Sequence, residues 1–160
     1  MGALGVSGAT SVRVGHAIGA GASPRRSGLL GLGLGAAVMT GGAIVFALAP
    51  RWLMGLFTRD ASVIAIGASL LRIAALFQLF DGVQAVAAGA LRGAGDVRFA
   101  FAANLVAHWL VGLPVALALA FGLDLGAAGL WWGLTTGLVV IAIALTARFL
   151  VLSRRAVARL

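Results

Sequence analysis

Asp81 is the residue of this sequence whose type and setting could do chemistry, because it is an acidic residue inside a long apolar stretch. Gln78 and Gln84 each lie three residues from it, so the three polar side chains share one face of a helix. Phe77 lies one turn before Asp81 on a neighbouring stripe. Desolvation favours the neutral form of a carboxylate, and a nearby cation favours its charged form. Asp81 could therefore hold a proton, a sodium ion or a cationic solute in turn. The alternative is a structural aspartate that a hydrogen bond or an arginine satisfies.

A second pair of polar residues, Asn104 and His108, lies one turn apart and ahead of Pro114. These residues are candidates for the lining of a substrate path, with His108 as a proton carrier near neutral pH. The alternative interpretation of the pair is a hydrogen bond between two helices. Pro114 lacks a backbone N–H, so we expect it to bend its helix, either as a hinge or only as a shape.

The inventory of residue types argues against an enzyme. The sequence contains no Cys, Tyr, Lys or Glu, and no two carboxylates stand at a motif spacing. His16 and His108 do not form an HExxH-like zinc pattern. A triad of Ser69, His108 and Asp81 could be assembled only by the fold, and no motif supports it. We therefore expect no enzymatic activity and no cofactor, and at most a bound sodium ion at Asp81.

The composition excludes a water-soluble globule. Of 160 residues, 62% are hydrophobic and only 10% are charged, whereas soluble domains have about 25% charged residues. The same hydrophobicity excludes a disordered chain. A net charge of +8 can indicate nucleic-acid binding. Here, however, the arginines are spread between apolar runs without a basic, aromatic patch. We expect no nucleic acid partner, and arginines placed at one face of a lipid bilayer.

Five apolar stretches predict a single all-α membrane domain over residues 1–160, with spans at about 4–20, 28–49, 62–91, 99–121 and 125–147. A helix needs roughly 20 residues to cross about 30 Å of hydrocarbon. The second, fourth and fifth stretches meet this length without an internal charge. The third is longer and carries Arg72 and Asp81, so it must tilt, protrude or line a polar interior. The first is the weakest, because it contains Arg13 and His16.

The arginines also predict the orientation of the chain. Eight of the 12 fall on one side of the predicted membrane: Arg25, Arg26, Arg92, Arg98, Arg148, Arg154, Arg155 and Arg159. By the positive-inside rule this side is the cytoplasm. This side includes a basic tail at 148–160, so we expect the C-terminus in the cytoplasm beneath the plasma membrane. The chain would then begin outside with a marginal span, so we expect it to be a fragment or half of a longer protein.

Two further patterns concern packing. Gly31 and Gly35 lie four residues apart, a spacing that lets helices approach closely in a membrane. We expect a helix–helix contact there. Trp131 and Trp132 follow the loop at Asp124, where aromatic residues anchor helices at the membrane interface.

Four segments of the sequence resemble a known family, the multidrug and toxic compound extrusion (MATE) transporters. The segment at 11–26 resembles the end of the eighth helix, and the segment at 76–98 resembles the tenth helix with its following loop. The segments at 104–114 and 126–134 resemble helices eleven and twelve. The stretch from Asp81 to Arg98 is the most specific part of this resemblance.

The resemblance implies a fold and a site. MATE proteins have twelve helices in two six-helix lobes, and this chain would supply about five helices of the second lobe. In sodium-coupled relatives a carboxylate at the position of Asp81 belongs to the cation site, with an aromatic residue one turn earlier. That residue is Phe77 here, where family members often have Tyr. A Glu in the seventh helix usually completes the site, and this sequence has none.

The expected function is therefore part of a secondary antiporter that exports cationic amphipathic compounds in exchange for Na⁺ or H⁺. The chain would need the missing N-terminal lobe, in the same or another chain, as its partner. One alternative is a non-transporting membrane scaffold or an inert remnant, in which Asp81 is incidental. Another is a lipid-linked oligosaccharide flippase of related architecture, for which Arg13 and Arg72 supply too few cavity arginines.

Overall fold

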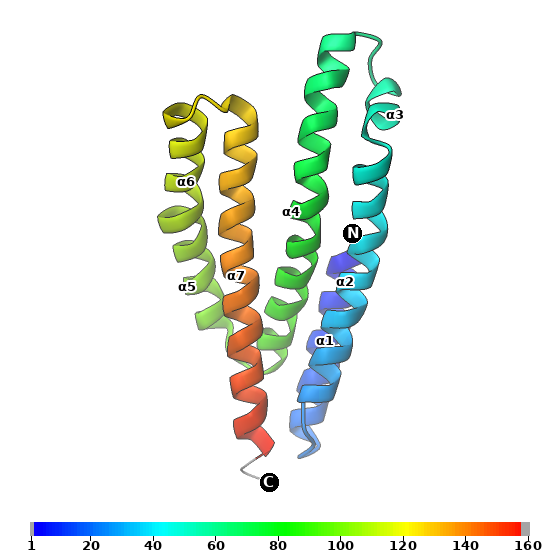
Figure 1. The fold of residues 1–160 in the computed structure, drawn as a ribbon. Coiled ribbons are helices and arrows are strands. Elements are labelled where there is room, and N and C mark those ends of the chain that lie inside the picture. Colours follow the sequence, from blue (N-terminus) through cyan, green and yellow to red (C-terminus); the bar gives the residue numbers. More distant parts are fainter. Residues whose placement is uncertain (1, 158–160) are drawn as a thin grey trace.

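Helix α4, of residues Ala61–Gly93, is the central element of the molecule, because the other long helices pack against it. The structure is a computed structural model that describes the backbone of residues 2–157 and the side chains of residues 2–154. Helices α1 (Gly2–Gly19), α2 (Arg25–Leu48) and the short α3 (Pro50–Gly55) lie on one side of α4. On the other side lie α7 (Gly126–Val157) and a composite helix over Val97–Gly122 (Figure 1).

The membrane character of the fold is confirmed, and the bounds of its helices can be compared with the predicted spans. Within residues 2–157 no strand occurs, and four helices are long and apolar enough to cross a membrane: α2, α4, the composite helix and α7. Helix α1 is not among them, so the predicted span at 4–20 stays a prediction. Helix α7 continues to Val157, well past the predicted end at Ala147, and so makes much of the predicted tail helical. The last tail residues, 158–160, lie outside the described part.

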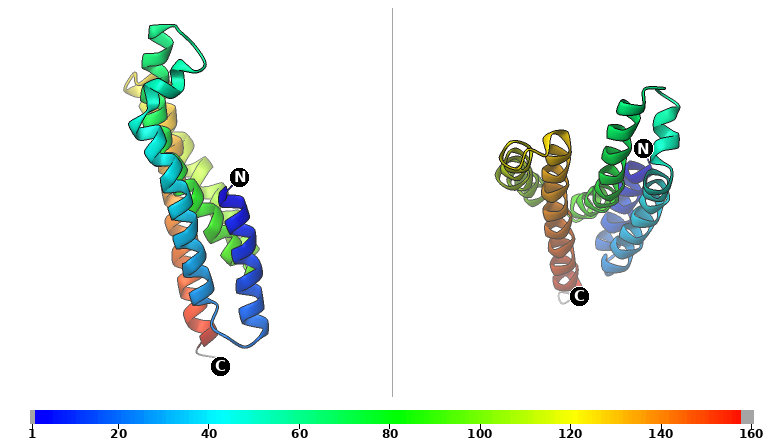
Figure 2. Two further views of the ribbon diagram at one scale, coloured as in Figure 1. Left: turned by 90° about the vertical axis from the view of Figure 1, so that its right-hand side faces the viewer. Right: turned by 45° about the horizontal axis from the view of Figure 1, so that its top comes forward.

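The buried core lies between the second half of α4 and the second half of α7. Val86 and Leu91 of α4 meet Ile141, Leu145 and Phe149 of α7 there, all of them fully buried. Above this core the ribbons of α4 and α7 diverge (Figure 2, right). The two halves of the molecule are therefore joined mainly at the end where the α1–α2 and α4–α5 connections lie.

The predicted contact at Gly31 and Gly35 is confirmed, and it involves two neighbours instead of one. A side chain at Gly31 would overlap Thr10 of α1. A Cβ atom at Gly35 would lie 2.6 Å from Val86 of α4. Helix α2 therefore uses successive glycines of one face to seat both α1 and α4, as small residues do in membrane helices.

A glycine also fixes the other half of the fold. Gly133 of α7 lies directly against the backbone of Ala116 in the composite helix, so that any Cβ atom at position 133 would overlap it. Gly133 is buried, and it brings the two helices of this hairpin into backbone contact.

Pro114 perturbs the composite helix through wide turns on either side of it. The helix consists of α5 (Val97–Leu105), the π-helical η1 (Val106–Gly112), α6 (Leu113–Leu117) and the π-helical η2 (Ala118–Gly122). The N–H of Leu113 donates to the carbonyl of His108, five residues back. Because the N–H of Pro114 is missing, the helix accommodates it with this π-type bonding.

The predicted separation of charges has a counterpart in the fold. The α1–α2 connection, the α4–α5 connection and the C-terminal end of α7 lie at one end of the bundle (Figures 1 and 2). We call it the arginine-rich end; its described arginines are Arg25, Arg26, Arg92, Arg98, Arg148 and Arg154. At the opposite end lie Arg51 in α3 and, on the connections, Arg59, Asp60 and Asp124. The assignment of the arginine-rich end to the cytoplasm stays a prediction.

Candidate functional site

The three polar residues singled out on α4 line one cavity. It has a volume of about 540 Å³ and lies between α1, α2 and α4. Gln78, Asp81 and Gln84 form its polar wall, and each is half-buried. The rest of its lining comes from residues of all three helices: Ala3, Leu4, Ser7, Met39, Ala85, Ala88 and Arg92. The three-residue spacing of the polar side chains places them on one stripe of α4, and that stripe faces the cavity.

The carboxylate of Asp81 is open to this cavity. The side-chain hydrogen bonds and the ion pair found within residues 2–154 do not involve it. Arg72, the arginine that shares this helix, is exposed on a different face of α4 and does not line the cavity. The described part of the chain thus supplies neither the hydrogen bond nor the arginine that a purely structural aspartate would need.

Gln78 is tied to the neighbouring helix. Its Nε2 atom donates to the carbonyl oxygen of Met39 in α2 at 3.4 Å, at the long end of hydrogen-bond distances. The contact holds the amide at the cavity wall and leaves its carbonyl oxygen available to a ligand.

Sequence reasoning missed Ser7, which lies in the cavity wall on α1. Ser7 is buried, and its hydroxyl donates to the carbonyl oxygen of Ala85 in α4 at 2.6 Å. This bond fixes α1 against the turn of α4 that follows Asp81. A serine among glycines and alanines gives no signal in the sequence beyond its small size.

Arg92 is a second cavity residue that the sequence did not reveal as such. The residues Asp81, Ala85, Ala88 and Arg92 follow one another at helical spacing along the cavity. At a rise of 1.5 Å per residue, Arg92 stands about 16 Å from Asp81 along the axis of α4. The cavity therefore has a carboxylate in its interior and a guanidinium at the arginine-rich end.

Phe77 is not brought to this cavity. It packs edge-to-face against Trp131 of α7, with ring centroids 5.5 Å apart and an interplanar angle of 80°. The neighbouring stripe on which Phe77 lies faces α7 instead of α1 and α2. Trp131 is accordingly half-buried and packs against α4, and only Trp132 has the exposed position expected of an interface anchor.

The second group of candidates lies on the composite helix, away from Asp81. Asn104 and Pro114 are exposed, and none of Asn104, His108 and Pro114 lines the cavity. The Nδ1 atom of His108 lies 3.1 Å from the backbone carbonyl oxygen of Asn104, within one helix. The expected hydrogen bond between two helices is therefore replaced by a bond along a single helix.

Polar contacts at the two ends of α4 hold this helix in place. At the start of α4, Asp60 accepts hydrogen bonds from the hydroxyl of Ser62 at 2.6 Å and from the N–H groups of Ser62 at 2.8 Å and Val63 at 3.4 Å. The hydroxyl bond of Ser62, followed by the backbone bonds, lowers the pKa of Asp60 below its ordinary 3.8. The N-terminal cap favours the charged form because its donors point at the carboxylate.

After α4, the turn is held by Asp96. The Nε atom of Arg148 in α7 donates to Oδ2 of Asp96 at 2.7 Å, and its guanidinium carbon lies 5.0 Å from the centre of the Phe99 ring. The pair joins residues 52 positions apart. This pair could not be predicted from the sequence, because Arg148 was expected to begin a tail.

The cavity can receive a cation. Carboxylate and amide oxygens are the donors that hard cations take in proteins. Asp81 supplies a charge, and Gln78, Gln84 and Ser7 supply neutral oxygens around the same space. Among residues 2–154, no cluster of three or more His, Cys, Asp or Glu side chains is positioned to hold a metal ion. The oxygen donors on the cavity wall are thus one carboxylate, two amides and one hydroxyl.

Comparison with known proteins agrees with this description. The MatE family model matches residues 1–118. The chain is 47% identical over 158 residues to the "Probable multidrug resistance protein NorM" of Deinococcus radiodurans, a match that covers 94% of this chain and 35% of that protein. It is 48% identical over 153 residues to the "Probable multidrug resistance protein NorM" of Pseudomonas aeruginosa, covering 91% of this chain and 31% of that protein. The "Multidrug resistance protein NorM" of Burkholderia vietnamiensis is 43% identical over 153 residues, with 91% and 33% covered.

A solved structure shares the fold. The crystal structure of the eukaryotic MATE transporter AtDTX14 superimposes with a TM-score of 0.82 at 30% identity, covering 98% of this chain and 37% of that one. The chain spans about a third of the length of the curated relatives it matches. It therefore has the fold of one part of a MATE transporter.

Proposed function

Because the chain belongs to the MatE family, we propose that it is part of a secondary antiporter that exports cationic amphipathic compounds in exchange for Na⁺ or H⁺. Asp81 is the residue on which this exchange depends. The observation that carries the proposal is the open position of the Asp81 carboxylate on a cavity of about 540 Å³, between Gln78 and Gln84. Curated relatives of 43–48% identity are named for multidrug resistance, which supports the same class of substrate.

The exchange follows from two occupants that exclude each other. At one stage of the transport cycle a proton or a sodium ion neutralises Asp81. At another stage a cationic compound does so. Each occupant must favour a different arrangement of the transporter by its own binding free energy, since a ligand that binds two states equally shifts neither. Rocking of two lobes around a site near the middle of the membrane is the general way in which such arrangements interconvert.

The roles of individual residues follow from their positions. Gln78 and Gln84 offer amide oxygens to the ion beside Asp81. Phe77 stabilises α4 against α7 through Trp131 and supports the site from outside. Asn104, His108 and Pro114 take no part at the ion, and a role along a substrate path would require surfaces from the remainder of a transporter.

Transport also requires more than this chain. The relatives are about three times longer, and MATE proteins consist of two lobes, so the N-terminal lobe is the expected partner. We place the assembled protein in the plasma membrane with the arginine-rich end in the cytoplasm, by the positive-inside rule.

The experiment joins this chain to the N-terminal part of the Deinococcus radiodurans relative that lies upstream of the matched region. The fusion is expressed in a bacterium that lacks its own efflux pumps, and export of a fluorescent cationic dye is measured. We expect export by the fusion and its loss in Asp81→Asn. The matched control is Asp124→Asn on the exposed connection between η2 and α7, because Asn tolerates the positive φ of 52° at that position.

The outcomes separate two parts of the proposal. Export that persists in Asp81→Asn removes Asp81 from the coupling. A fusion that reaches the membrane and exports no dye removes the transport function itself from this chain.

A further inference from the structure

The arginine-rich end has few acidic counter-charges in the described part of the chain. Of the four aspartates, Asp60 and Asp124 lie at the opposite end and Asp81 lies within α4. The fourth, Asp96, is engaged by Arg148. Within residues 2–154, no carboxylate is therefore paired with Arg25 or Arg26, both of which are exposed at the start of α2. An anionic ligand at this surface would therefore meet two arginines that no described carboxylate neutralises.

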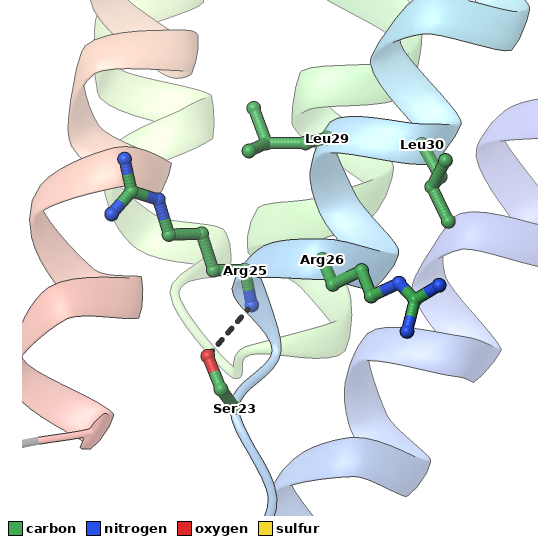
Figure 3. A pocket seen from close by; sticks show the side chains of 5 residues that line it. All are labelled: Ser23, Arg25, Arg26, Leu29 and Leu30. Atoms are coloured by element: carbon green, nitrogen blue, oxygen red, sulfur yellow. Dashed lines mark hydrogen bonds between the residues drawn. The ribbon is translucent and has the colours of Figure 1, made fainter.

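Arg25 and Arg26 stand at the mouth of a pocket. It has a volume of about 460 Å³ and is lined by Ser23, Arg25, Arg26, Leu29 and Leu30. Figure 3 shows the two guanidinium groups extending to opposite sides, that of Arg25 towards α7 and that of Arg26 towards α1. The two leucines lie one turn further along α2, with 44% and 60% of their surfaces exposed. The pocket thus joins a cationic rim to an apolar wall.

A second, smaller groove continues this surface between α1 and α2. It has a volume of about 210 Å³, and Leu30 belongs to both hollows. Its lining is largely apolar and includes one further guanidinium, that of Arg13. The lining residues are Val6, Ala9, Thr10, Arg13, Ser27, Leu30, Gly31 and Leu34. The continuous surface therefore runs from the two arginines at the end of the bundle towards its apolar middle.

We propose that this surface binds one anionic phospholipid of the adjoining leaflet. The phosphate lies at the guanidinium of Arg26, which extends towards α1, while Arg25 adds positive charge from the other side of α2. An acyl chain follows Leu30 into the groove between α1 and α2. Guanidinium groups suit phosphate oxygens because they offer several charged donors in one plane. The apolar groove is what distinguishes a lipid from a free phosphate, which would use the rim alone. This binding is independent of Asp81 and of transport.

The test measures lipid binding by the purified full chain in detergent, using native mass spectrometry. The probes are phosphatidylglycerol, phosphatidylcholine and glycerol phosphate, the last of which has the phosphate without acyl chains. A surface arginine contributes about a 5-fold gain in the binding of anionic lipid. We expect R25Q/R26Q to bind phosphatidylglycerol about 25-fold more weakly than the unaltered chain. The matched control, R51Q/R59Q, removes two exposed arginines at the opposite end and should bind as the unaltered chain does.

Four results would overturn the proposal. Two concern the variants: equal binding of phosphatidylglycerol by R25Q/R26Q and the unaltered chain, and an equal loss of binding in R51Q/R59Q. Two concern the probes: binding of phosphatidylcholine, or of glycerol phosphate, that is as tight as binding of phosphatidylglycerol. Should R25Q/R26Q lose its helical circular dichroism, Leu30→Ser provides the test. Loss of the apolar contact should weaken lipid binding about 5-fold, and unchanged binding would refute the proposed acyl site.

Discussion

Replacing Gly133 by Ala tests the backbone contact between α7 and the composite helix. The new Cβ atom would overlap the backbone of Ala116, and backbone atoms cannot move aside as a flexible side chain can. Overpacking of this kind costs about 1–3 kcal/mol, and a backbone contact belongs to the upper part of that range. Alanine also favours the helix over glycine by about 1 kcal/mol. We therefore expect Gly133→Ala to lower the free energy of unfolding by about 2 kcal/mol.

The matched control is Gly33→Ala on α2. Gly33 is exposed, and a Cβ atom added there meets nothing within 4 Å, so only the helix preference of alanine remains. This variant should gain up to about 1 kcal/mol. The difference between the two variants is then about 3 kcal/mol, and the helix preference cancels from the comparison.

The assay is unfolding of the chain in mixed micelles by increasing mole fractions of sodium dodecyl sulfate, followed by circular dichroism. Both variants are compared with the unaltered chain under the same conditions. Equal stability of Gly133→Ala and Gly33→Ala would refute the backbone contact between α7 and the composite helix, because nothing else separates the two substitutions.

Two further predictions concern the ends of α4. Asp96→Asn removes the charge from the partly exposed pair with Arg148, and we expect a loss of about 1 kcal/mol in the same unfolding assay; a loss that stays the same in high salt would contradict an ionic origin. Because the folded pKa of Asp60 lies below 3.8, the stabilisation it gives is complete above that pH and is lost as the pH falls through the folded pKa. Asp60→Asn keeps a capping side chain without a titrating group, so the slope of stability against pH below 3.8 should be smaller in that variant; identical slopes would exclude the cap as the cause.

Local spacing in the sequence predicted the polar wall of the cavity. Three-residue intervals place Gln78, Asp81 and Gln84 on one stripe whatever surrounds the helix. The direction of Phe77 could not be predicted in this way, because it depends on where α7 lies. The position of Ser7 in the cavity wall could not be predicted either, because it depends on where α1 lies.

Long-range contacts account for the remaining differences. The pair of Asp96 and Arg148 requires knowledge that α7 continues as a helix past Ala147, and arginines near its end had suggested a tail. The π-helical turns beside Pro114 depend on which carbonyl each N–H selects, and a proline indicates only that one bond is missing. The functional roles of the cavity residues remain predictions for the experiments above.

The wide turns in the composite helix have a consequence for the direction of its side chains. A π turn holds about one residue more than an α turn, and each residue of a helix advances about 100° around its axis. The side chains of Val97–Leu105 therefore point about 100° away from the azimuth that an unbroken α-helix through Leu113–Leu117 would assign to them. A helical wheel drawn across Val97–Gly122 would consequently misplace Asn104 by roughly a quarter of a turn.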